Sequence, residues 1–209
     1  MQKHAQHSLR GVIAMPAMPA KHTIAKYTAV TAILFAISFV SGYVYAVLNP
    51  AAATEITLEL TTGFEWITEL NPLVIMLVIF LNNAVKSLIV ILLGVLIVVP
   101  IGFIVCNGCI LGIVAYEYGR TMSCGYVAAA ILPHGVIELP MIFMSAALGT
   151  HLGVMGVSRL RGTISSEEIL SELRRSVSFY FRWILPLLFV AAAIETFVTP
   201  IVLYLLGWA

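Results

Sequence analysis

The sequence predicts an all-α, polytopic transmembrane helix bundle, and three observations support this prediction. Hydrophobic residues occupy 61% of the 209 positions, and the mean hydropathy is +1.03. Only 10% of the residues are charged, against roughly 25% in a soluble domain. Several apolar runs reach the ~20 residues that a helix needs to cross the hydrocarbon core. We therefore expect about five spans together with amphipathic interfacial helices. The alternative is six spans, one of them broken or re-entrant.

The chain divides into a basic tail, residues 1–26, and a single transmembrane domain, residues 27–209. The tail is rich in lysine, arginine and histidine and contains two spaced prolines. The first span covers 27–48. Positive charge lies before this span and none follows it directly, which predicts a cytoplasmic N-terminus.

The segment 51–70 contains four glutamates and neither lysine nor arginine. Its apolar residues recur at helical spacing, which is typical of an amphipathic helix lying on a membrane surface. We expect such a helix over 54–70, on the outer face. A solvated acidic loop is the alternative.

Residues 71–118 are almost uninterruptedly apolar and long enough for two spans. A tight turn near 93–95 would give spans of 72–92 and 95–117. The alternative is an interfacial segment over 71–83, followed by one long helix kinked at Pro100.

Charge decides between these alternatives. Residues 158–182 carry five arginines, so this segment should be cytoplasmic. With a cytoplasmic N-terminus, an even number of spans must precede it. Two spans in 71–117, the first span and a span over 126–150 satisfy this condition.

A cytoplasmic interfacial helix is expected over 165–182, because Ser165 and Glu168 have capping-box spacing. The last span is expected over 183–207, interrupted by two prolines. Five spans place the C-terminus outside.

The most informative motif is Pro133-His134-Gly135-Val136-Ile137-Glu138-Leu139-Pro140, set inside apolar sequence. His134 and Glu138 are four residues apart and share a helix face. Ionisable groups in hydrocarbon cost roughly 2.5–3.5 kcal/mol each on insertion scales, so they usually face a protein interior or a wet cavity. The pair is either a proton or cation relay or a buried hydrogen-bonded lock between helices, and we expect the lock.

Other polar residues at membrane depth complete this polar core or ion pathway: Asn82, Asn83, Lys86, Asn107 and Glu195. Lys86 either approaches Glu138 or Glu195, which would lower the cost of both charges, or snorkels to the inner surface. Asn82 and Asn83 either cap a broken helix or join helices by hydrogen bonds, and we expect the second.

Cysteines offer a weaker signal. Cys106 and Cys109 are three residues apart, and with His134 they could complete a metal site. Buried cysteine is usually a small hydrophobe, so we expect no metal and no cofactor. No zinc-protease or serine-hydrolase signature is present, and an intramembrane metal-dependent hydrolase is the least supported function.

Small residues and prolines are expected at helix contacts. Gly108 and Gly112, like Gly149 and Gly153, have the spacing that lets two helices approach closely. These glycines could build the core of one chain or a contact between copies, and core packing is favoured. The full set of packing residues is Gly108, Gly112, Pro133, Gly135, Pro140, Gly149 and Gly153.

Four segments, in this order, resemble the integral membrane family of stage II sporulation protein M: Phe80-Leu81-Asn82-Asn83, Asn107-Gly108-x-x-x-Gly112, Leu132-Pro133-His134-Gly135-x-x-Glu138-Leu139-Pro140 and Ala146-x-x-Gly149-x-x-x-Gly153. The similarity covers roughly residues 27–207. The family's namesake looks like a membrane anchor that assembles a cell-wall-degrading complex during engulfment. The resemblance therefore implies a scaffold whose partners carry any catalysis.

We accordingly expect a non-enzymatic scaffold in the cytoplasmic membrane. The alternative is an ion- or proton-coupled channel or transporter that uses the polar core. Expected partners are the lipid bilayer, a second copy of the chain (a dimer is favoured) and other membrane or cell-envelope proteins. A net charge of +1 argues against a nucleic-acid partner.

Overall fold

The computed structural model describes residues 21–208, which form helices and contain no strand. Five helical segments of this part are long and apolar enough to cross a membrane. This agrees with the predicted all-α bundle. The basic tail up to residue 20 lies outside the described residues. The first described helix begins at Lys21, six residues before the predicted start of the first span.

The described elements, in chain order, are α2 (Lys21–Leu48), α3 (Pro50–Thr68), α4 (Pro72–Leu92), the 3-10 turn η1 (Leu93–Val95), α5 (Val98–Thr121), α6 (Cys124–Leu160), α7 (Ser166–Phe179), the π-helical turn η2 (Tyr180–Ile184), α8 (Leu185–Ala193), the π-helical turn η3 (Ile194–Val198) and α9 (Thr199–Leu205).

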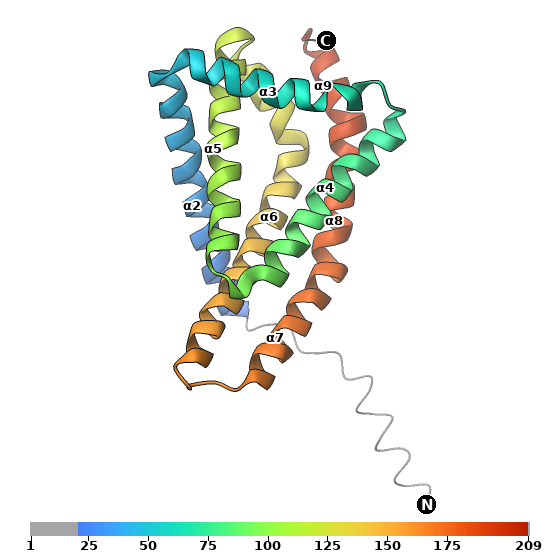
Figure 1. Ribbon diagram of the computed structural model, residues 1–209. Coiled ribbons are helices and arrows are strands. Elements are labelled where there is room, and N and C mark those ends of the chain that lie inside the picture. Colours follow the sequence, from blue (N-terminus) through green and yellow to red (C-terminus); the bar gives the residue numbers. More distant parts are fainter. Residues whose placement is uncertain (1–20, 209) are drawn as a thin grey trace, which may run out of the picture.

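The long helices run roughly along one direction, and α3 lies across one end of the bundle (Figure 1). The C-terminus lies at this same end. The hairpin that joins α6 to α7 lies at the opposite end, where α2 begins. The predicted acidic segment is therefore a helix that crosses the bundle, not a loop. It runs over Pro50–Thr68, with proline in its first turn, where the missing N–H is not needed.

The apolar stretch 71–118 forms two helices, α4 and α5, joined at η1. Pro100 does not kink a long helix. It lies in the first turn of α5, where its missing N–H leaves no hydrogen bond unmade. The turn is close to α6: a Cβ at Gly94 would collide with the backbone of Gly149.

Glycines hold the helices together within one chain. A Cβ on Gly108 would lie 2.8 Å from the carbonyl oxygen of Phe35 on α2, and one on Gly112 would collide with the carbonyl of Phe39. The second pair packs α6 in the same way, since a Cβ on Gly149 would lie 2.5 Å from the Val90 carbonyl oxygen. The small-residue pairs therefore serve the core of the monomer.

The last helical run continues from Ser166 to Leu205 over 40 residues. The expected interfacial helix over 165–182 is thus not a separate element, and it joins the last span through η2. The two prolines that were expected to interrupt the span are accommodated by wider helical turns: η2 ends two residues before Pro186, and η3 ends two residues before Pro200. A π-turn relieves the clash of a proline ring with the carbonyl four residues earlier.

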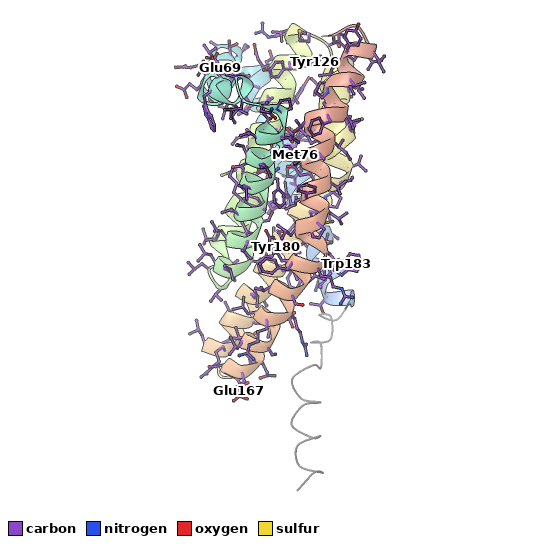
Figure 2. All side chains as sticks on the ribbon, turned by 90° about the vertical axis from the view of Figure 1, so that its right-hand side faces the viewer. Glu69, Met76, Tyr126, Glu167, Tyr180 and Trp183 are labelled. Carbon is purple, nitrogen blue, oxygen red and sulfur yellow. The ribbon has the colours of Figure 1, made fainter. Side chains whose placement is uncertain are left out.

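Both helices of the hairpin are longer than a membrane is thick. At 1.5 Å per residue, the 37 residues of α6 and the 40 residues from Ser166 to Leu205 extend over about 55 and 60 Å, against ~30 Å of hydrocarbon. The charged helix α7 therefore projects beyond the bundle, with Glu167 at its far end (Figure 2).

The first turn of α7 has the predicted capping box. The Ser165 N–H donates to Glu168 Oε2 at 2.7 Å, and the Glu168 N–H donates to Ser165 Oγ at 3.2 Å. Hydrogen bonding to Ser165 holds the pKa of the exposed Glu168 carboxyl below its usual value.

The end of α7 is anchored in the core. Tyr180 is 2% exposed and packs with Ile91, Leu148 and Leu188. Its hydroxyl donates to the Ala84 carbonyl oxygen on α4 at 2.8 Å. This contact connects the last helix to α4 (Figure 2 shows Tyr180 pointing inward between these helices).

Candidate functional site

Three ionisable side chains meet between α6 and the last helix. His134 and Glu138 extend from α6 and Glu195 extends from η3. Each offers one ligand atom, and these atoms lie within 4.8 Å of one another. All three residues are half-buried. We call His134, Glu138 and Glu195 the triad.

The backbone that carries the triad is irregular on both sides. Pro133 and Pro140 lie inside α6, and each removes the hydrogen bond that its N–H would donate one turn back. Glu195 lies in the π-helical turn η3, and such turns occur frequently at functional sites. The proline-flanked motif of α6, which the sequence predicts to lie at membrane depth, is thus close to η3, the π-helical turn of the last helix that carries Glu195.

The charges around the triad do not balance locally. Glu138 and Glu195 repel each other. Lys86 on α4 attracts Glu138, although it makes no contact ion pair with it. Lys86 is exposed on the surface of the bundle.

One nitrogen of the triad has no partner. The Nδ1 atom of His134 is buried and makes no hydrogen bond within the described part of the chain. A buried polar atom without a partner costs about 1–3 kcal/mol. A histidine with one unpartnered ring nitrogen therefore belongs to the same group as two carboxylates.

A cavity of about 540 Å³ adjoins the triad. Its lining comes from α3, α4 and η3: Trp66, Ile67, Val78, Ile79, Asn82, Asn83 and Glu195. Asn82 donates to the side-chain oxygen of Asn83 at 3.3 Å. Glu195 is thus shared between the triad and a space that the crossing helix α3 borders.

The structure separates the remaining predicted residues from this site. The Asn107 side chain donates to the Phe103 carbonyl of its own helix at 2.7 Å and is not part of the triad. Cys106 and Cys109 do not belong with His134 in a group that could hold a metal; the group found among the described residues is the triad. The three-residue spacing of Cys106 and Cys109 relates them only to each other, on α5. The partners of His134 come from its own helix, α6, and from η3.

A second polar cluster was not found from the sequence. His151 Nδ1 lies 3.5 Å from Glu172 Oε1, and Arg175 Nη1 lies 3.6 Å from Glu172 Oε2. The ring of Tyr27 packs on His151 with centroids 5.4 Å apart. These residues come from α2, α6 and α7, so no local spacing signals them. They join the start of α2 to the hairpin.

A third cluster attaches α3 to α5. Glu117 is 7% exposed and accepts hydrogen bonds from Arg120 at 2.9 Å and from Thr54 at 3.2 Å. The crossing helix is therefore fixed at its N-terminal half, whereas its C-terminal half borders the cavity.

Comparison with known proteins agrees with the sequence motifs. The family model described as stage II sporulation protein M matches residues 31–200, which is most of the chain and includes the triad. No curated protein and no solved structure matches the chain. The chain belongs to the stage II sporulation protein M family.

Proposed function

We propose that this protein is a non-enzymatic cation channel or transporter, in which the triad binds the cation inside the membrane. One observation carries the proposal: His134, Glu138 and Glu195 come together from two helices, and Glu195 also lines the cavity below α3. Intramembrane ionisable residues mark ion and proton pathways by default.

Charge balance favours binding over a purely structural lock. A lock should pair its charges, because an unpaired buried charge costs several kcal/mol. Here Lys86 attracts Glu138, and the imidazole of His134 is the one member of the triad that can carry a positive charge beside Glu195. A proton or another bound cation would neutralise the remaining carboxylate.

The end of the bundle that α3 crosses is suited to collecting cations. Glu55, Glu59 and Glu69 are exposed there, and Figure 2 shows Glu69 at the outer corner. Clustered charge of one sign raises the local concentration of counter-ions, over the ~8 Å on which physiological salt screens it. With the arginine-rich hairpin on the cytoplasmic side of the cell membrane, the cavity would face outward.

The test is cation and proton flux in proteoliposomes, comparing the unchanged chain with Glu195→Gln. The matched control is Glu167→Gln, which removes an exposed carboxylate at the opposite end of the molecule. Flux should be lost in Glu195→Gln and kept in the control, at equal melting temperatures. Absence of flux in the unchanged chain, or equal flux in all three, would refute the function.

A membrane scaffold is the second candidate, and a different observation favours it. The α6–α7 hairpin projects beyond the bundle (Figure 1) and exposes Arg159, Arg161 and Arg174, which suits contact with other proteins. A scaffold of the proposed kind is a dimer and has no flux. Light scattering in detergent should then give twice the mass of one chain, and a monomer without flux would contradict both candidates.

A further inference from the structure

We infer that the triad is a binding site for one divalent first-row transition-metal ion, with Zn²⁺ or Mn²⁺ as the representative probes. The inference names the cation and so rests on the proposed function, but binding is measured separately from flux. Its starting point is the meeting of one imidazole and two carboxylates from α6 and η3.

The distances are those of a site that a small adjustment can complete. The three ligand atoms lie within 4.8 Å of one another. Nitrogen and oxygen ligands at about 2.0–2.2 Å from a tetrahedral metal are about 3.3–3.6 Å apart. Rotation of the two glutamate side chains, together with a small approach of η3 to α6, would close this difference. The ion would then join α6 to η3.

The donor atoms select the class of metal. Imidazole suits zinc, iron and nickel, and carboxylate oxygen extends the range to manganese. Cuprous copper prefers sulfur, and the cysteines of α5 lie outside the triad. Calcium takes six to eight oxygen ligands, more than two carboxylates and the neighbouring amides readily supply. Three protein ligands leave coordination positions open to water from the cavity, as in sites where an ion or substrate exchanges.

The charges of the two carboxylates and the unpartnered nitrogen of His134 also favour a bound metal ion. A divalent ion neutralises Glu138 and Glu195 together, which removes their mutual repulsion and the cost of two carboxylates at membrane depth. It also gives a partner to a histidine whose Nδ1 atom has none. Lys86, which attracts Glu138, opposes the ion, so Lys86→Gln should bind the metal more tightly.

The experiment is calorimetric titration of the chain in detergent, stripped with a chelator, with Zn²⁺ and separately with Mn²⁺. The background replaces His4 and His7 by glutamine, because histidine side chains outside the triad can also bind zinc. One ion per chain is expected. Since loss of even an outer-shell partner weakens metal sites 10–100-fold, Glu195→Gln and His134→Gln should each weaken binding at least ~10-fold. Cys106→Ala/Cys109→Ala is the matched control and should bind unchanged.

Each outcome decides a separate claim. Saturable binding that survives both Glu195→Gln and His134→Gln, or no saturable binding by the chain, overturns the site. If one of these variants fails to fold, the melting temperature tests the site instead. The metal should raise the melting temperature of the unchanged chain and should not raise that of the other variant. Binding without flux keeps the site and refutes transport. Proton flux without metal binding refutes the site and keeps transport.

Discussion

The close packing of α2 on α5 makes a quantitative prediction for Gly112→Ala. A Cβ at this position would collide with the Phe39 carbonyl oxygen and would lie 2.8 Å from the Tyr43 nitrogen. Both are backbone atoms, so no side-chain rotation relieves the contact and the two helices must separate. Overpacking of this kind costs about 1–3 kcal/mol of unfolding free energy.

The same helix supplies the control. At Gly102 an added Cβ meets no atom within 4 Å, so Gly102→Ala should stabilise the protein by roughly 0.5–1 kcal/mol through backbone entropy. Because this gain applies to both Gly→Ala substitutions, the two alanine variants should differ by the overpacking cost, about 1–3 kcal/mol. Reversible unfolding in mixed micelles, followed by circular dichroism, measures the difference. Equal stabilities would show that α2 and α5 do not pack at Gly112 as described.

Two further substitutions test the last helix. Tyr180→Phe removes the hydrogen bond to the Ala84 carbonyl and should cost about 0.5–1.5 kcal/mol in the same unfolding assay, whereas Tyr204→Phe, at a position 70% exposed, should cost nothing measurable. Glu168→Ala removes the carboxylate that accepts the Ser165 N–H and should lower stability at neutral pH. Because the folded-state pKa of Glu168 is depressed, its contribution is present above the unfolded-state pKa and is lost as pH falls through the folded-state pKa. The difference in stability between Glu168→Ala and the unchanged chain should therefore narrow in acid, and a difference independent of pH would contradict this account.

The spans could be predicted because the bilayer imposes a simple length rule. Apolar runs of about 20 residues and the asymmetry of arginine predict five crossings, and the break at Gly94 predicts the turn between α4 and α5. The length of the last helix could not be predicted in this way. Pro186 and Pro200 suggest interruptions, yet a π-helical turn accommodates each one and the helix continues. Local propensity does not distinguish a broken helix from a widened one.

The site could be predicted only as far as local spacing extends. His134 and Glu138 share a face of one helix, so their proximity follows from the sequence. Glu195 joins them through the packing of η3 on α6, which no spacing encodes, although an acidic residue in a hydrophobic span is a signal that it faces inward. Asn107 was expected in the polar core, and its amide donates to a carbonyl of its own helix. Polar side chains in a helix regularly have this local alternative.

The two candidate functions share one mechanical element. The helices that carry the triad are also the helices of the projecting hairpin: α6 continues from Glu138 to His151, and the last run connects Glu172 to Glu195. An ion that draws η3 towards α6 would change the spacing of these rods at one end of the hairpin. The π-helical turn η2 lies between α7 and α8, and its stiffness would determine how much of this change reaches α7.

Amide hydrogen exchange measures that transmission directly. If the helices move as rigid rods, Zn²⁺ should slow exchange in α7 as well as around η3, and Glu195→Gln should abolish both effects. Slower exchange confined to η3 would show that the motion stops at η2, so that ion binding has no effect on the α6–α7 hairpin. Slowing in α7 that persists in Glu195→Gln would place the metal at the His151–Glu172 pair instead. Coupling between the triad and α7 would therefore depend on the five residues of η2. Hydrogen exchange in α7 tests this coupling even when no partner protein is known.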